Sequence, residues 1–348
     1  MTTSKKNEKD QLMDWQEIET QFKALSAAHS PARQRILSDI FRSALKLTQD
    51  SPGTLNLKIS SSVLKELRYS FKKFAPYKHH PKITIFGSAR VAPDKPLYRM
   101  AKKFAAEAVK RNYMVITGGG PGIMAAGNEG AEKHGFGLNI RLPVEQSANQ
   151  FIDAERHLIN YKYFFTRKLF LVKEAAAFAF FPGGFGTFDE AFEVLTLLQT
   201  GKTNMIPVVF MEPKGFGFWA PLVKFMKEVM LKKGFISKSD QSLYHVFNTE
   251  EDALDHIAHF YRNYHSMRFV GDKLSIRIKK ELSTAHLKKA NQLFPTLTHL
   301  GKIVASNAMP EEENEPDINS LPRLVFPFDR KDFGSLRSLI DFINDCEL

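Results

Sequence analysis

The stretch that decides the fold is residues 178–193, FAFFPGGFGTFDEAFE. An apolar, aromatic run ends at Pro182, three glycines follow (Gly183, Gly184 and Gly186), and a helical pattern begins directly behind them. Glycine lets backbone N–H groups approach a ligand closely, and a helix N-terminus offers unpaired donors and a partial positive charge. The stretch therefore predicts an anion site, most often a phosphate site, to which Thr187 adds a hydroxyl donor.

Two carboxylates, Asp189 and Glu190, follow the glycines. Acidic residues in the first turn of a helix have an ordinary role, because they complement the helix dipole. A carboxylate beside a phosphate cradle also suggests chemistry at a carbon of the sugar that carries the phosphate.

Strand and helix patterns alternate on both sides of this stretch. The predicted strands follow apolar, β-branched and aromatic runs: 82–86, 114–117, 138–142, 178–181 and 206–211. This alternation favours an α/β fold, a Rossmann-like doubly wound and mainly parallel sheet. Three strands end in glycine-bearing turns, at Gly87, 118–122 and 183–186, and ligands bind beyond the carboxyl ends of such strands. We expect these three turns to line the opening of a single ligand site.

Three domains are predicted. Residues 1–75 form a helical N-terminal extension, with a turn at 51–53, and residues 76–265 form the core, closed by helices over 219–231 and 250–264. Residues 266–348 form a mixed C-terminal extension, with a strand over 272–278, a helix over 281–294 and an acidic linker near 311–317. The apolar tail from 321 onward is expected to dock on the core or on a partner subunit.

The composition is that of an ordinary soluble protein. The chain has 348 residues, with 43% hydrophobic and 25% charged side chains. We find no apolar run long enough for a membrane span, and the polar N-terminus does not resemble a signal peptide. The lone Cys346 excludes an internal disulfide and a cysteine-based metal cluster, so the cytoplasm is the expected location.

A net charge of +11 raises the question of nucleic acid as a partner. Lysine and arginine are spread along the chain, without an arginine-rich arm, zinc-finger spacing or an aromatic RNA-binding signature. Nucleic-acid binding is therefore not expected, and a basic surface for anionic small molecules explains the charge equally well.

The glycine loops match no standard nucleotide fingerprint. Gly201-Lys-Thr203 ends like a P-loop, but the glycine required five positions earlier is Thr196. The loop at 118–122 fails G-x-G-x-x-G, because position 123 is Ile. The histidines show no metal-ligand spacing, so we expect neither a metal nor a cofactor.

Arg167 and Lys168 close an aromatic run that begins at Tyr161. An exposed cation at a helix end is the simplest interpretation of Arg167. The functional interpretation is an arginine that reaches the phosphate or sugar of a bound nucleotide, since its fork of donors suits an oxyanion.

These residues together resemble the LOG (Lonely Guy) family of cytokinin riboside 5′-monophosphate phosphoribohydrolases and bacterial nucleotide nucleosidases. The resemblance covers about residues 60–265 and rests on GGGPGIM (118–124), Arg167-Lys168 and PGGFGTFDE (182–190). Gly87-Ser88, Leu142-Pro143 with Glu145-Gln146, and 199–202 resemble the larger bacterial branch.

The resemblance implies Arg167 and Glu190 as the catalytic pair. It implies phosphate binding by Gly183, Gly184, Gly186, Thr187, Gly119, Gly120 and Gly122, and further substrate contacts from Gly87, Ser88, Lys168, Met124 and Asp189. Phe185 and Asp189 stand where the small plant-type enzymes carry Tyr and Glu, which puts substrate choice in doubt more than activity. Family members pair through core helices, so a homodimer or a higher homo-oligomer is expected.

The expected reaction is hydrolysis of the N-glycosidic bond of a nucleoside 5′-monophosphate, with AMP as the default substrate and a cytokinin nucleotide as another. Glu190 would stabilise an oxocarbenium-like transition state and orient or deprotonate the attacking water. The alternative is a carrier on the same fold that binds a nucleotide or molybdenum cofactor without cleaving it. An amino-acid decarboxylase would need a cofactor bound to a lysine, and no lysine here has a supporting motif.

Overall fold

The computed structural model describes residues 15–50, 52–141, 147–298, 301–312 and 318–347. Contacts divide the chain into two compact units, residues 1–65 and 66–348. The predicted helical character of the N-terminal region is confirmed where the structure describes it: α1 (Trp15–Ser26), α2 (Pro31–Gln49) and α3 (Thr54–Phe74). Within the first unit, the rings of Phe22 and Phe41 stack at 4.7 Å. The three-domain division of the chain stays a prediction.

The second unit is built on a seven-stranded parallel sheet, with the order β4-β3-β2-β1-β5-β6-β7. Its strands are β1 (Lys82–Phe86), β2 (Met114–Thr117), β3 (Gly135–Ile140), β4 (Leu158–Tyr161), β5 (Ala177–Phe180), β6 (Val208–Met211) and β7 (His245–Phe247). The chain winds outward from β1 to one edge, returns to β5 beside β1, and winds to the other edge. This confirms the doubly wound α/β fold and puts its switch point between β1 and β5.

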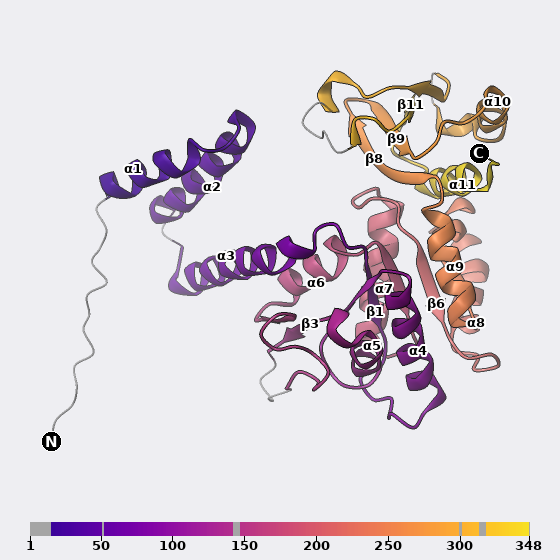
Figure 1. The fold of residues 1–348 in the computed structure, drawn as a ribbon, viewed down its shortest axis with the longest axis horizontal. Helices are drawn as coiled ribbons and strands as arrows, with labels where there is room; N and C mark the ends of the chain where they lie inside the picture. Colours follow the sequence, from indigo (N-terminus) through magenta and orange to yellow (C-terminus); the bar gives the residue numbers. More distant parts are fainter. Residues whose placement is uncertain (1–14, 51, 142–146, 299–300, 313–317, 348) are drawn as a thin grey trace. The chain divides into compact units, whose positions relative to one another are not determined.

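Side-chain alternation along the strands separates two apolar layers. Ile83 and Ile85 join the layer under α4 (Pro96–Lys110), α5 (Ile123–Ala131) and α9 (Glu250–Phe260). Phe178 and Phe180 join the opposite layer, under α6 (Phe164–Lys173), α7 (Phe185–Gln199) and α8 (Trp219–Phe225). Because successive side chains of a strand point to opposite faces, each strand contributes to both layers. Figure 1 shows α4 and α5 beside β1 within this unit.

A second, antiparallel sheet follows the parallel one, in the order β10-β11-β9-β8. Its elements are β8 (Tyr264–Val270), β9 (Lys273–Ile278), β10 (Val304–Ser306) and β11 (Arg323–Pro327), with helices α10 (Thr284–Leu293) and α11 (Phe333–Asp345). Apolar residues of β9 and α11 belong to the same buried cluster as α6 and α7. Helix α11 also contacts α7 and α9. The apolar tail therefore docks on its own chain.

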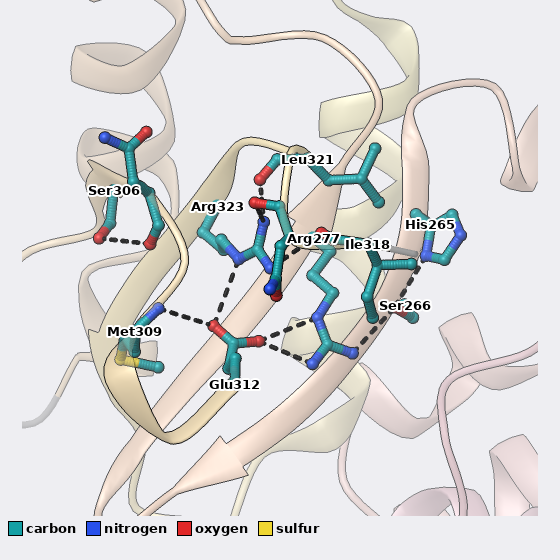
Figure 2. A network of polar contacts seen from close by, with 11 residues as sticks. His265, Ser266, Arg277, Ser306, Met309, Glu312, Ile318, Leu321 and Arg323 are labelled. Carbon is teal, nitrogen blue, oxygen red and sulfur yellow. Dashed lines mark hydrogen bonds and ion pairs between the residues drawn. The ribbon is translucent and has the colours of Figure 1, made fainter. Parts of the chain in front are cut away.

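A buried ionic network links β9 and β11 of this second sheet to the turn at 310–312 (Figure 2). Glu312 lies between Arg277 of β9 and Arg323 of β11, with nitrogen–oxygen distances of 2.7 and 3.2 Å. All three side chains are buried, and Met309 donates its backbone N–H to the same carboxylate. A buried charge is costly unless it is paired and hydrogen-bonded, so Glu312 is stable in this position only while these contacts persist. The contacts therefore hold the 310–312 turn against the sheet.

Several predicted boundaries are wrong by a few residues. The third strand is 135–140 rather than 138–142, since glycines at 135 and 137 allow close packing under Asn128 and Ile152. The aromatic run 161–168 contains the end of β4 and the start of α6, and the helix predicted over 250–264 ends at Phe260. Strands β4 and β7 were not predicted because each is three or four residues long and lacks a strong apolar run.

No helix in the described part of the chain is long and apolar enough to cross a membrane. Four sequence features lie wholly or partly outside the described residues: the polar N-terminus, Leu142-Pro143, Glu145-Gln146, and residues 313–317 of the acidic linker.

Candidate active site

The loops that follow β1, β2 and β5 converge at the switch point of the parallel sheet. The N–H of Ser88 donates to the carbonyl of Pro182 at 3.1 Å, and the N–H of Ile123 donates to the carbonyl of Ser88 at 3.0 Å. A cavity of about 680 Å³ lies at this junction, a size that suits a small-molecule ligand. The predicted site residues along it are Gly87, Ser88, Met124, Arg167, Gly184, Gly186, Thr187, Asp189 and Glu190.

The N-terminus of α7 opens onto this cavity. The first intrahelical bonds are donated by Thr187 and Phe188 to the carbonyl of Gly184, at 3.0 and 3.2 Å. The N–H groups of Phe185 and Gly186 precede these bonds and are the ones a helix leaves for a ligand. A Cβ added at Gly184 or Gly186 would meet nothing within 4 Å. Packing within the chain therefore does not require these glycines, and their backbone is open to the cavity.

Other predicted phosphate glycines have a structural reason to be glycine. A Cβ at Gly183 would lie 2.1 Å from the Thr187 hydroxyl, and one at Gly122 would lie 2.3 Å from the carbonyl oxygen of Ser88. Gly119 has a φ of +75° and accepts a hydrogen bond from Asn149. None of these three, nor Gly120, is among the residues that line the cavity. Their phosphate contacts stay a prediction.

Arg167 is braced by backbone carbonyls. Its Nε donates to Leu138 at 2.7 Å and its Nη2 donates to Gly118 at 3.3 Å. Burial lowers the pKa of the guanidinium, opposed by the nearby carboxylate of Glu190. Because α6 carries the side chain and β3 and the β2 loop receive it, the guanidinium is fixed at the edge of the cavity.

Glu190 is the buried carboxyl group of the cavity, with 7% of the residue exposed. Burial raises its pKa to about 7, against the opposing effect of Lys168 and Arg167 and with the support of Asp189 and Glu193. Its Oε2 atom has no hydrogen-bond partner among the described residues. A carboxyl group of this kind exchanges a proton near neutral pH, which is the property of a general acid or base.

Lys168 is not among the residues that line this cavity. Its ammonium group is 2.8 Å from Asp189 and 2.5 Å from Glu193. The predicted substrate contact of Lys168 stays a prediction, whereas the structure shows its ion pairs with two carboxylates of α7.

The structure adds cavity residues that the sequence did not single out. Arg90 follows Gly87-Ser88 on the β1 loop, and Phe164 and Phe188 come from α6 and α7. Arg90 is exposed, so it brings an accessible cation to the mouth. Its position two residues after Gly87-Ser88 was the available signal, but spacing alone does not separate a cavity cation from an ordinary surface one.

Comparisons with known proteins match the part of the chain that carries this cavity. Residues 115–257 match the model of a family described as "possible lysine decarboxylase". Over 164 residues the chain is 25% identical to cytokinin riboside 5′-monophosphate phosphoribohydrolase LOG2 of Arabidopsis thaliana, covering 45% of this chain and 73% of that protein. Both matches support the resemblance of this segment to the LOG family. The catalytic pair and the α7 glycine loop implied by the resemblance both lie within the matched segment.

The alignments with similar solved structures cover about half of this chain. A molybdenum cofactor binding protein from Rippkaea orientalis is 17% identical with a TM-score of 0.39, covering 52% of this chain and 96% of that one. The molybdenum cofactor carrier protein of Chlamydomonas reinhardtii is 20% identical with a TM-score of 0.36, covering 52% of this chain and 97% of that one.

Proposed function

We propose that this chain hydrolyses the N-glycosidic bond of a nucleoside 5′-monophosphate, giving the free base and ribose 5-phosphate. The observation that carries the proposal is the position of Glu190. This buried carboxyl group, with a pKa of about 7, lines the same cavity as the open N-terminus of its own helix. A phosphate on that N-terminus would put the attached ribose beside the carboxyl group.

In the proposed reaction, backbone N–H groups at the start of α7 bind the 5′-phosphate, and Arg90 adds positive charge at the mouth. The C1′–N bond breaks, its electron pair leaves with the base, and positive charge develops on the ribose. Ionised Glu190 stabilises that charge and accepts a proton from the water that bonds to C1′. That proton passes to the departing base, which leaves as the neutral molecule, and Glu190 returns to its ionised form. Binding energy from the phosphate, remote from the reacting bond, positions the sugar.

Arg167 is proposed to orient the ribose or Glu190, since its guanidinium lines the same cavity. AMP is the first substrate to test. A cytokinin nucleotide is the second, because the Arabidopsis relative carries that activity in its name. The cytoplasmic location stays a prediction.

Gly186→Ala tests the phosphate cradle. The added methyl group has open space around it and favours a helix by about 0.5–1 kcal/mol, so the variant should fold at least as well as the wild type. It should raise KM for AMP at least tenfold, because the methyl group occupies the place of the phosphate. Base release is measured by chromatography for AMP and adenosine, with the melting temperature as the control for folding. A wild type that prefers adenosine, or an Ala variant with unchanged KM for AMP, would contradict the proposal.

We also propose that the chain forms a homodimer or a larger homo-oligomer through α6 and α7. Phe165 and Leu169 on α6 are 56% and 45% exposed, and Phe185 at the start of α7 is 96% exposed. Light scattering should give at least twice the mass of one chain, and Phe165→Ser should reduce it. A monomeric wild type overturns this part of the proposal.

A further inference from the structure

One cation, Lys168 of α6, faces three carboxylates of α7. Its ammonium nitrogen lies 2.8 Å from Oδ2 of Asp189, 2.5 Å from Oε2 of Glu193 and 3.8 Å from Oε2 of Glu190. These three acids fall within the first turns of one helix, so the lysine neutralises a concentrated negative charge. Although burial alone would lower the pKa of Lys168, the hydrogen bonds that it donates to Asp189 and Glu193 raise it. The ammonium group therefore stays charged through the neutral range.

The charges around Glu190 come from both helices that contact it. Lys168 and Arg167 on α6 favour its ionised form, while Asp189 and Glu193 on α7 oppose it. Burial is the largest influence and favours the protonated form. Among the charges that favour the ionised form of Glu190, Lys168 therefore has the largest effect. Its ammonium nitrogen lies 3.8 Å from Oε2 of Glu190, the oxygen that has no hydrogen-bond partner among the described residues.

We propose that Lys168 is a positioning residue that gathers the carboxylates of α7 and sets the fraction of Glu190 that is ionised. Its own proton stays on the ammonium nitrogen. The effect on the reaction rests on the proposed function, but the effect on Glu190 does not.

The proposal predicts shifts of opposite sign in two variants. An opposite charge within about 4–6 Å lowers the pKa of a carboxyl group by roughly 1–3 units. Lys168→Met should therefore raise the pKa of Glu190 by about 1 unit. Glu193→Gln should lower it, because one negative charge disappears and Lys168 is released toward Glu190.

The first test is a carbon-13 NMR titration of protein labelled at the glutamate carboxyl carbons, with the Glu190 resonance identified by its loss in Glu190→Gln. It needs no turnover. Upward movement of the titration midpoint in Lys168→Met and downward movement in Glu193→Gln support the proposal. A midpoint that stays within about 0.3 unit of the wild type in both variants overturns it.

The second test is the pH dependence of kcat/KM for base release. The kcat/KM of Lys168→Met should be about tenfold below that of the wild type at pH 6 and should approach the wild-type value at pH 9. The kcat/KM of Lys168→Arg should be close to that of the wild type throughout. Lys173→Met is the matched control, because Lys173 lies on the same helix and pairs with Glu174 at 2.6 Å instead. A loss that is equal at every pH would mean that Lys168 contacts the substrate, and the proposal would fail. If the wild type cleaves no nucleotide, the proposed function fails, while the NMR titration still decides the role of Lys168.

Discussion

At the scale of single residues, Glu190 links function to stability. Its pKa in the folded protein is about 7 against an ordinary value of 4.5. Between those two pH values the folded chain binds more protons than the unfolded chain, so the free energy of unfolding falls as pH rises. Above pH 7 the free energy of unfolding is lowered by the full cost of ionising the buried carboxyl group.

Glu190→Gln should therefore stabilise the protein at pH 8 by about 1–3 kcal/mol, since each unit of pKa shift is worth about 1.4 kcal/mol. The difference should shrink toward zero as the pH falls to 5. Urea denaturation at pH 8 and pH 5 measures it. A Gln variant that is less stable than the wild type at pH 8, or whose difference does not depend on pH, would contradict the assignment of the raised pKa.

Gly122 is a second residue whose substitution gives a definite prediction. Its φ is +67°, and a Cβ there would lie 2.3 Å from the carbonyl oxygen of Ser88, which belongs to backbone that cannot easily move. Gly215 has a φ of +80° but open space around it. Both Ala variants acquire backbone strain of about 1 kcal/mol or more, and Gly122→Ala adds a clash.

We expect Gly122→Ala to lower the free energy of unfolding by at least about 2 kcal/mol more than Gly215→Ala. The melting temperature and urea midpoint of the two variants are the measurements. Equal losses would show that the loops after β1 and β2 do not pack as described.

At the scale of elements, α9, β7 and α11 meet around two half-buried histidines. The rings of His245 and His256 lie 4.4 Å apart, and Nη2 of Arg337 is 3.2 Å from Nε2 of His256. Burial, with Arg337 close by, lowers the pKa of His245 to about 4 and that of His256 to about 3. Both are therefore neutral in the folded protein at neutral pH.

These histidines gain protons on unfolding below pH 6.5, so the unfolded chain is favoured as the pH falls from 6.5 toward 4. Between pH 6.5 and pH 5 we expect the free energy of unfolding to fall by about 2–4 kcal/mol. In His256→Asn this fall should be roughly half as large. Urea denaturation at several pH values gives the slope, and His79→Asn, at an exposed position, is the control. An unchanged slope in His256→Asn would exclude this pair as the cause.

Elements were predictable where their sequences are strongly patterned. The strands over 82–86 and 114–117 and the loops that follow them were predicted from apolar runs ending in glycine. Strands β4 and β7 were not, because sheet pairing rather than local sequence stabilises such short segments.

The site was predictable to the same extent. Residues 182–190 carry a local signature, so the cradle and Glu190 were named from the sequence. The carbonyls of Leu138 and Gly118 that brace Arg167, and the carboxylates around Lys168, arise from contacts between distant segments or between helices. Sequence spacing does not report such contacts.

At the scale of the whole molecule, the C-terminal sheet shares its buried cluster with the layer under α6 and α7. Damage to the Arg277–Glu312–Arg323 network should therefore affect the stability of the whole second unit. Burial alone would raise the pKa of Glu312, but hydrogen bonds from Met309 and Arg277 hold it below its usual value.

Glu312→Ala should lower the free energy of unfolding by about 3–5 kcal/mol, because it leaves two arginines buried without this carboxylate. Glu311→Ala is the matched control, one residue earlier and exposed. Denaturation and hydrogen exchange are the measurements. Loss of protection should reach α7 as well as β9 and β11. A change confined to the turn at 310–312 would show that the antiparallel sheet is independent of the parallel-sheet core.

The most direct test of the account compares wild type with Glu190→Gln in base release from AMP under single-turnover conditions, with nucleotide binding measured by calorimetry on the same samples. We predict retained binding and a rate that is lower by about 10²–10⁴, the usual contribution of a general base. If the Gln variant releases base at the wild-type rate, or if the wild type binds AMP and the other nucleoside monophosphates without releasing base, the carboxyl group is not catalytic and the cavity serves a carrier or sensor.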